Sequence, residues 1–336
     1  MRAYEVGGGK ATDAPEAVER PEPTAGPGQV VVRVRATSLN FRDLSVAGGQ
    51  YGKNQPRVIP LSDGAGEVAA VGPGVTRVKV GDRVAATFMQ AWTSGPALGR
   101  YSDSALGGSI DGMLAEKVVL GEDGLVVLPD SLAFEQAAAL PCAGVTAWNA
   151  LFDAGRTVPG DTVLVQGTGG VSIIALQLAH AAGARVVVTS SSDAKLERAK
   201  KLGAVFGINY KTTPKWSEEA MRWNAGAGVD HIVEVGGSGT FDQSLRGTRA
   251  GGTISCIGVL SGGAGEIRTA LILLKSIRVQ GIYVGSRAMF EALLRAIVAH
   301  RIEPVIDRVF PFDQAPEAYR HMKSGAHFGK IVIAGP

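Results

Sequence analysis

A glycine-rich stretch at residues 167–171, Gly-Thr-Gly-Gly-Val, lies between an apolar run and a segment with helical periodicity. In such a turn the backbone can approach a pyrophosphate closely, and the free N–H groups at the helix N-terminus favour anions. Residues 161–166 and 185–189 are typical of strands, and residues 170–182 place apolar side chains on one helical face. This context favours dinucleotide binding at Gly167, Gly169 and Gly170 over an ordinary tight turn.

The end of the second strand indicates which dinucleotide is bound. NAD sites usually place an acidic residue there, about 20 residues after the turn, to bind the ribose 2′-hydroxyl. Here the position holds three serines, 190–192, whose hydroxyls accept a phosphate. Cations that could neutralise that phosphate follow or precede them: Lys195, Arg198 and Arg185. The pattern favours NADP(H) over NAD, although Ser192 and Asp193 could instead cap the next helix, or Asp193 could turn inward and serve NAD.

Further glycines follow later strand-like runs. They are Gly236-Gly237 and, after the next run, Gly258 with Gly262-Gly263. The carboxyl ends of parallel strands share one edge of a sheet, so a single extended ligand could touch all of them. The alternative is that they are ordinary loop glycines.

The domains and strands predicted around the glycine-rich turn determine where it lies in the fold. With 336 residues, 45% hydrophobic and 19% charged, it can bury a large core and is expected to form about two domains. Short strand-like segments between residues 29 and 127 predict an irregular β-rich unit. Strands and helices then alternate and predict an α/β fold with a doubly wound sheet of six parallel strands. The six predicted strands are 161–166, 185–189, 205–208, 229–235, 253–259 and 277–284.

We expect the β-rich domain to begin the chain as residues 1–126 and the dinucleotide-binding domain to cover residues 127–285. Residues 286–336, with helical stretches at 289–300 and 316–323 and a last strand at 330–334, are expected to return to the first domain.

Charge and cysteine content exclude several classes of partner. The formal net charge is +3, from 34 basic and 31 acidic residues without a block of like charge, so nucleic acid is not expected as a partner. Two cysteines, Cys142 and Cys256, give no disulfide framework, which is typical of a reducing compartment, and we expect the cytoplasm. No apolar run reaches the length of about 18 residues that would predict a membrane span.

The β-rich N-terminal unit, the stretch 142–147 (Cys-Ala-Gly-Val-Thr-Ala) and the 167–171 turn together resemble the medium-chain dehydrogenase/reductase superfamily over nearly the whole chain. Residues 38–44 (Ser-Leu-Asn-Phe-Arg-Asp-Leu) and the triplet 208–210 (Ile-Asn-Tyr) are similar to its quinone oxidoreductase and enoyl reductase branch. The resemblance implies a GroES-like catalytic domain, a Rossmann domain and oxidoreductase activity.

Zinc-dependent members of this superfamily hold the catalytic metal with a cysteine, a histidine and a second cysteine. Those positions correspond to Asn40, Ser62 and Cys142 here. Because a catalytic zinc needs about three protein ligands, we expect no zinc. The four-cysteine structural zinc lobe is not expected either, since no cysteine lies between Met1 and Pro141.

The resemblance also implies roles for single residues. The residues that it places near the nicotinamide are Asn40, Tyr51, Ser62 and Thr146. The residues that it places against the rest of the cofactor are Gly170 and Val171 at the pyrophosphate, Ser190, Lys195 and Tyr210 at the 2′-phosphate, and Lys330, which would reach the cofactor phosphates. Simpler alternatives are a turn-forming role for Asn40, a position at the rim for Tyr51 and a packing role for Tyr210.

Without a metal, the oxygen of the substrate must be polarised by hydrogen bonds. This favours hydride transfer to a quinone or to the β-carbon of an α,β-unsaturated carbonyl compound. Asn40, Ser62 or Tyr51 could donate to the developing oxyanion, and Tyr51 or solvent could supply the proton. Two alternatives remain: an alcohol dehydrogenase, with a metal at Cys142 assisted by Asp63, and a non-catalytic NADPH-binding redox sensor.

Two further segments concern assembly and substrate access. Residues 272–284 are predicted to end the sheet as an exposed apolar edge strand, which a second copy of the chain would cover in a homodimer. The loop at residues 90–108, rich in Gly, Ser and Ala, is expected either to flank the substrate cleft or to replace the zinc lobe.

Overall fold

The computed structural model describes residues 1–8, 11–50 and 57–335. The chain forms two compact units, one made of residues 1–145 and 284–336 and the other of residues 146–283. Residues 127–145, assigned above to the second domain, are part of the first unit. The reason is that α2 (Phe134–Ala138) packs against β3 (Gln29–Ser38) and β4 (Asp63–Val71) of that unit.

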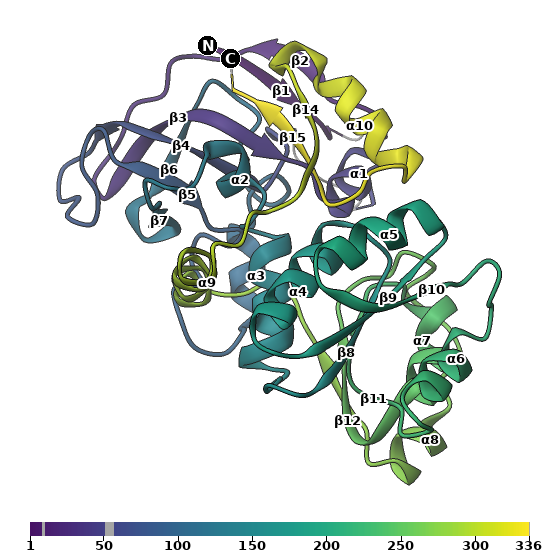
Figure 1. Cartoon of the computed structure of the whole chain (residues 1–336). Coiled ribbons are helices and arrows are strands. Elements are labelled where there is room, and N and C mark those ends of the chain that lie inside the picture. The colour runs from purple at the N-terminus through teal and green to yellow at the C-terminus, as the bar shows by residue number, and fades with distance from the viewer. Residues whose placement is uncertain (9–10, 51–56, 336) are drawn as a thin grey trace. The chain divides into compact units, whose positions relative to one another are not determined.

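The first unit is built on a mainly antiparallel sheet in the strand order β14-β15-β3-β4-β5-β7, with β6 paired to β3 as well. Its other strands are β5 (Arg83–Ala86), β6 (Lys117–Gly121), β7 (Leu125–Val127), β14 (Ile306–Phe310) and β15 (Lys330–Ala334). A separate pair consists of β1 (Arg2–Glu5) and β2 (Glu16–Glu19). The last strand, β15, pairs antiparallel with β3, so the end of the chain returns to its beginning (Figure 1).

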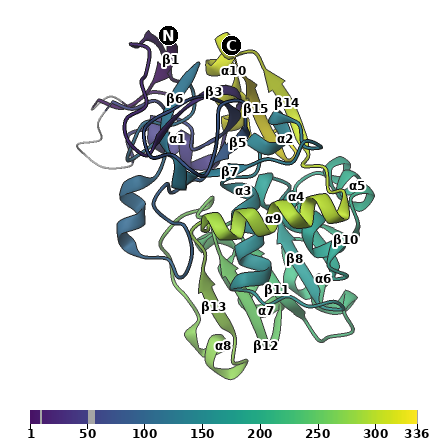
Figure 2. The same ribbon diagram turned by 90° about the vertical axis from the view of Figure 1, so that its left-hand side faces the viewer.

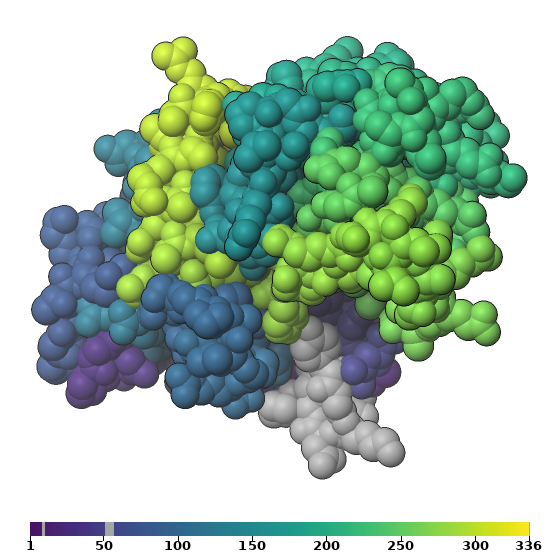
Figure 3. All heavy atoms as spheres, turned by 90° about the horizontal axis from the view of Figure 1, so that it is seen from below, coloured from purple at the N-terminus to yellow at the C-terminus, as the bar shows by residue number. Residues whose placement is uncertain are grey.

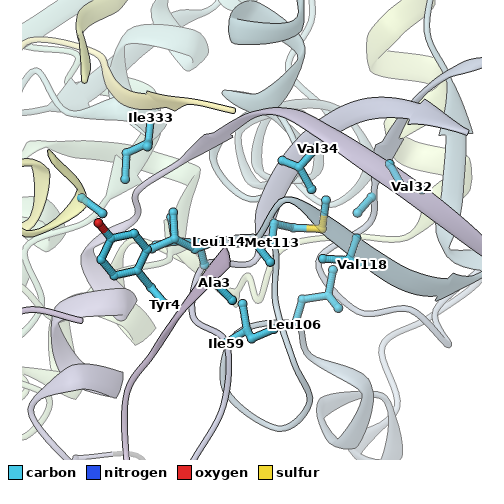
Figure 4. Packing of buried hydrophobic residues seen from close by; sticks show 14 of the residues in the cluster. Ala3, Tyr4, Val32, Val34, Ile59, Leu106, Met113, Leu114, Val118 and Ile333 are labelled. Atoms are coloured by element: carbon cyan, nitrogen blue, oxygen red, sulfur yellow. The ribbon is translucent and has the colours of Figure 1, made fainter. Parts of the chain in front are cut away.

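The core of the first unit follows from period-two alternation in its strands. Val30, Val32 and Val34 of β3 all belong to one buried cluster, because alternate side chains point to one face. Tyr4, Met113 and Ile333 pack in the same cluster (Figure 4). Close approach of the strands requires Gly66 in β4, where a Cβ would lie 2.0 Å from the backbone oxygen of Arg33.

The second unit is a six-stranded parallel sheet in the order β10-β9-β8-β11-β12-β13, which confirms the predicted doubly wound fold. Its strands are β8 (Thr162–Gln166), β9 (Arg185–Ser190), β10 (Ala204–Asn209), β11 (Val229–Glu234), β12 (Thr248–Cys256) and β13 (Arg278–Gly281). Its helices lie on both faces of the sheet (Figure 1). They are α4 (Gly170–Ala181), α5 (Asp193–Lys201), α6 (Trp216–Trp223), α7 (Ser238–Gly247) and α8 (Thr269–Leu274).

The predicted edge strand at 272–284 was too long. Its first residues belong to helix α8, and only the four residues of β13 pair with β12. Leu271 and Ile272, both in α8, pack partly buried against the core of the second unit. Figure 2 shows α8 and β13 together at this edge of the sheet.

Several short elements lacked a clear sequence pattern and were not predicted. They are α1 (Phe41–Ala47), α2, α3 (Ala143–Trp148), the π-helical turn Asn149–Asp153, α8 and β14. The helices expected at 289–300 and 316–323 are present as α9 (Arg287–His300) and α10 (Ala315–Ser324). Within the described ranges, none of the helices combines the length and the apolar character needed to cross a bilayer.

The segment 90–108 is packed on itself. Trp92 is 2% exposed, its indole N–H donates to the Gly95 carbonyl at 3.0 Å, and its ring stacks on Tyr101 with 5.8 Å between centroids. Figure 3 shows this blue segment as a compact lobe on the surface. The lobe is organised by aromatic stacking and a short helix, Gly99–Ser104.

Candidate active site and dinucleotide turn

The glycine turn has the backbone geometry that phosphate binding requires. Gly167 has φ +70°, a left-handed conformation that favours glycine, and Gly169 is the N-cap of α4. A Cβ on either glycine would meet open space, with no atom of the described chain within 4 Å. Ser172, which replaces the last glycine of the usual pattern, closes the turn by donating to the Gln166 carbonyl at 2.6 Å. The turn therefore leaves room for a phosphate against the helix N-terminus.

The residues expected around the 2′-phosphate are close together. Ser190 ends β9, is 2% exposed and accepts the backbone N–H of Tyr210 at 3.0 Å. Ser192 caps α5, accepting the backbone N–H of Lys195 at 3.4 Å. Because β9 pairs with both β8 and β10, these residues lie at the same sheet edge as the Gly167 turn. The capping alternative for Ser192 is thus correct, and it is compatible with phosphate binding by its neighbours.

Two charged residues of this region, Arg185 and Asp193, have partners within the second unit. Arg185 cannot neutralise the phosphate, because it is the first residue of β9, whereas the predicted phosphate site is at the carboxyl end of this strand. Its guanidinium donates to Asn224 at 3.1 Å and lies over the Trp223 ring. Asp193, the residue that could have favoured NAD, accepts the side-chain amide of Asn209 at 2.8 Å.

Gly236 and Gly258, which follow β11 and β12, lie where neighbouring atoms leave no space for a Cβ. The backbone N–H of Gly236 donates to Glu234 at 2.8 Å, and a Cβ there would lie 2.2 Å from the Thr240 hydroxyl. A Cβ on Gly258 would lie 2.3 Å from the Val235 carbonyl oxygen. Tight packing is sufficient to require glycine at both positions, and the prediction that they also contact a ligand stays a prediction.

A cluster of polar side chains surrounds Asn40 in the first unit. The side-chain nitrogen of Asn40 donates to the Ser62 hydroxyl at 3.4 Å, and Ser62 donates to Asp63 at 2.6 Å. The Asp63 carboxylate also accepts the backbone N–H of Cys142 at 3.1 Å. Lys330 donates to the side-chain oxygen of Asn40 and lies 3.7 Å from Asp63. We call Asn40, Ser62, Asp63, Cys142 and Lys330 the Asn40 cluster.

The cluster corrects two expected roles. Lys330 is 3% exposed and its amino group is directed at the Leu39 carbonyl, Asn40 and Asp63, so it does not reach out to cofactor phosphates. Ser62 has a single hydroxyl hydrogen, which Asp63 accepts, so Ser62 cannot donate to a substrate while this bond lasts. Asn40 keeps the donor group expected of it.

The Asn40 cluster does not fit a catalytic zinc. Burial raises the pKa of the Cys142 thiol, and the negative charge of Asp63 raises it further. Cys142 is the one residue of the three matched positions that zinc would accept as a ligand, since Asn40 and Ser62 offer only an amide and a hydroxyl. The amide oxygen of Asn40 and the Asp63 carboxylate both face the Lys330 amino group. In the part of the chain that the structure describes, no three His, Cys, Asp or Glu side chains are grouped as a metal site.

Sequence reasoning missed Asp43, which fixes the backbone at Asn40. Its carboxylate accepts the Asn40 backbone N–H at 2.7 Å and caps helix α1. Burial raises the pKa of Asp43 to about 6, against the opposing charge of Arg42. The signal was present, since an acidic residue three positions after Asn40 is typical of a capping box.

The other two residues expected near the nicotinamide, Thr146 and Tyr51, are not part of the Asn40 cluster. Thr146 is 3% exposed on α3 and belongs to the second unit. Tyr51 lies outside the described residues.

Comparison with known proteins agrees with this architecture. Residues 26–130 match the family described as alcohol dehydrogenase GroES-like domain, and residues 170–299 match the zinc-binding dehydrogenase family. The chain belongs to the medium-chain dehydrogenase/reductase superfamily. The predicted GroES-like and Rossmann-type domains of this superfamily are confirmed, and so is oxidoreductase activity as the general class.

Individual members of the superfamily differ in what they are described to do. A zinc-type alcohol dehydrogenase-like protein of Schizosaccharomyces pombe is 47% identical over 95% of this chain and 94% of its own. A solved NAD-dependent alcohol dehydrogenase is 34% identical with a TM-score of 0.90, and 99% of both chains is covered. The quinone oxidoreductase of Pseudomonas syringae is 28% identical with a TM-score of 0.82, again over 99% of both.

Proposed function

We propose that the chain is a zinc-independent reductase that transfers a hydride from NADPH to a quinone or an α,β-unsaturated carbonyl compound. The observation that carries the proposal is the Asn40 cluster. At the position of a metal ligand in zinc-dependent members, this chain has a neutral amide whose oxygen is held by a buried lysine. Such an amide can donate a hydrogen bond to a carbonyl oxygen, and it is a poor ligand for zinc.

Bound NADPH would supply the hydride, and the residues of the chain bind it and prepare the acceptor. The Asn40 amide carries two hydrogens, of which one is directed at Ser62 at 3.4 Å. The other donates to the substrate oxygen, where negative charge develops as the hydride arrives. Ser62 and Asp63 orient the amide without donating to the substrate themselves.

We propose NADPH as the cofactor because of the groups at the ends of β9 and β10. Ser190, Lys195 and Tyr210 gather hydroxyls and a cation there, where an NAD site would usually have a carboxylate. A nearby carboxylate, that of Asp193, accepts the side-chain amide of Asn209. The Gly167–Val171 turn would hold the pyrophosphate in either case.

The proposal includes a homodimer in a reducing compartment such as the cytoplasm. Leu273 and Leu274 of α8 are 78% and 79% exposed beside the edge strand β13, and a second copy of the chain would cover them. Cys142 and Cys256 are both free thiols. Sedimentation equilibrium should give twice the chain mass, and Leu273→Lys with Leu274→Lys should give the monomer.

The activity is tested with purified protein whose metal content is measured first. Loss of NADPH absorbance is followed with a simple quinone and with an enone, each with and without a chelator. We expect turnover with at least one acceptor and no effect of the chelator. Asn40→Ala should lower kcat by about 100-fold, as removal of an oxyanion donor does, with the Kd for NADPH unchanged.

The second candidate is alcohol oxidation, which the description of the S. pombe relative favours. It predicts that primary or secondary alcohols with NAD or NADP give a nicotinamide absorbance that depends on bound metal. Stoichiometric zinc together with loss of this activity on chelation would replace the reductase proposal with an alcohol dehydrogenase.

A further inference from the structure

We propose that Lys330 is a positioning residue for Asn40, and that its charge orients and polarises the amide that meets the substrate oxygen. The inference rests on the proposed function for its catalytic consequence. Its structural part, that Lys330 determines which way the amide faces, can be tested without any turnover.

The position of Lys330 follows from the pairing of β15 with β3. Val332 is opposite Ser38, and Ala334 is opposite Ala36. The same register continues beyond the strand end, since the backbone N–H of Leu39 donates to the Ile331 carbonyl at 3.1 Å. Two residues further along this antiparallel register, Lys330 is across from Asn40. The final strand of the chain therefore brings a cation to a residue 290 positions earlier.

The contacts of Lys330 determine the orientation of the Asn40 amide. An amide can turn its oxygen and nitrogen around, but an ammonium group has three donors and no acceptor. Lys330 can therefore face only the oxygen of Asn40, at 2.6 Å, and the NH2 group must point away from it toward Ser62. The same amino group donates to the Leu39 carbonyl at 2.6 Å, which fixes it against the end of β3.

Burial makes this contact electrostatically strong. Asn40 is 8% exposed, Lys330 3% and Asp63 fully buried. In such a low-dielectric surrounding, a cation on the amide oxygen withdraws electron density from the amide and strengthens its N–H groups as donors. Asp63, 3.7 Å from Lys330, compensates the buried charge. The Asn40 amide therefore lies between the positive charge of Lys330 and the expected position of the substrate oxygen.

The first experiment separates this role from binding of cofactor phosphates. Lys330→Met keeps the length of the side chain and removes the charge. We expect kcat to fall by about 30-fold or more while the Kd for NADPH changes by less than about threefold, because only stabilisation of the transition state is lost. The matched control is Lys323→Met, which removes a 59% exposed lysine of α10 and should change neither value. Weaker NADPH binding with unchanged kcat would overturn the proposal.

The second experiment controls for the unpaired charge that Lys330→Met leaves on Asp63. In the double variant Lys330→Met with Asp63→Asn, both buried charges are absent, and we expect thermal stability to recover. Because Asp63 also orients the amide through Ser62, the kcat of the double variant is compared with that of Asp63→Asn alone and should be lower. If the two values are equal, Lys330 only balances charge and the positioning role is wrong.

A crystal structure of Lys330→Met distinguishes failure of this inference from failure of the proposed function. We expect the Asn40 amide to rotate or to occupy two orientations, judged from its distances to Ser62 and the Leu39 carbonyl. An amide that keeps its present orientation would overturn the inference even if the enzyme reduces quinones. A rotated amide in a protein that reduces no acceptor would support the inference and leave the proposed reaction wrong.

Discussion

The side-chain amide of Gln166 donates to the Glu234 carboxylate at 2.6 Å, joining the carboxyl ends of β8 and β11. These two strands are neighbours at the point where the strand order of the sheet reverses, which is where doubly wound folds bind their ligands. Glu234 is fully buried and also accepts from the hydroxyl groups of Thr240 and Ser244. The floor of the expected cofactor crevice is therefore a closed hydrogen-bond network.

Glu234→Gln should destabilise the second unit strongly. The carboxylate accepts from several donors, and an amide would turn its own NH2 group toward some of them, leaving buried donors unpaired. We expect a loss of roughly 2–4 kcal/mol, seen as a fall of roughly 5 °C or more in the thermal midpoint. The control is Glu218→Gln, a 58% exposed carboxylate paired with Lys215, which should shift the midpoint little. Equal midpoints for the two variants would show that the network contributes nothing.

Gly169→Asp should weaken dinucleotide binding while the fold remains intact. Gly169 is the N-cap of α4, a position where aspartate is among the favoured residues, so helix stability should be kept or improved. Its carboxylate would nevertheless repel the pyrophosphate at the helix N-terminus. Gly169→Asn is the neutral control of nearly equal size. Fluorescence titration with NADPH should give a Kd at least about tenfold higher for the aspartate variant than for the asparagine variant, as one unit of charge repulsion implies. The assignment of this turn to the pyrophosphate fails if the two variants bind alike.

Lys195→Ala should shift cofactor preference toward NADH. Lys195 lies in the first turn of α5 beside the Ser192 cap, at the sheet edge that carries Ser190. Removing a cation from a phosphate contact costs about 1–2 kcal/mol, so the ratio of kcat/KM for NADPH over NADH should fall by about 5- to 30-fold. Lys200→Ala, in the last turn of the same helix, should leave the ratio unchanged. A ratio that Lys195→Ala does not move would remove this residue from the 2′-phosphate site.

The parts of the fold that sequence predicted well are those with local patterns. The 167–171 turn, the helix after it and the six parallel strands depend on periodicity and glycine placement within about 30 residues of chain. Ser190 and Tyr210 lie at the ends of the adjacent strands β9 and β10, and their roles at the 2′-phosphate stay predictions. The edge strand at 272–284 was overextended because an apolar run of this length reads equally well as strand or helix.

The roles that sequence could not supply depend on contacts between distant parts of the chain. Lys330 was expected to reach the cofactor phosphates, and only the pairing of β15 with β3 shows that it is buried beside Asn40. Arg185 looked equivalent to Lys195 until the strand direction placed it at the other sheet edge. Gly236 was predicted as a ligand contact, and the sequence did not reveal that its backbone N–H also donates to Glu234.

The buried carboxyl of Asp43 should make stability fall as the pH rises through the acid range. Burial raises its pKa from 3.8 to about 6, so the folded chain holds this proton more tightly than the unfolded chain. The sign follows from linkage: the contribution is fully present below the unfolded pKa and is lost as the pH rises through the folded value. The groups that set the pKa besides burial are Arg42, the backbone N–H of Asn40, Asp63 and Lys330. The loss should be on the order of 3 kcal/mol, because one pKa unit corresponds to about 1.4 kcal/mol.

Asp43→Asn isolates this effect, because asparagine can still accept the Asn40 backbone N–H but does not titrate. Thermal midpoints of both proteins are measured in steps between about pH 4 and pH 7.5, with buffers of equal ionic strength. The variant should gain on the unmodified protein as the pH rises, with most of the change between about pH 4 and pH 6. The attraction between ionised Asp43 and Arg42 is already contained in the folded-state pKa, so it does not change the size or the pH range of the expected gain. A difference in midpoint that stays constant across this range would mean that folding does not raise the pKa of Asp43.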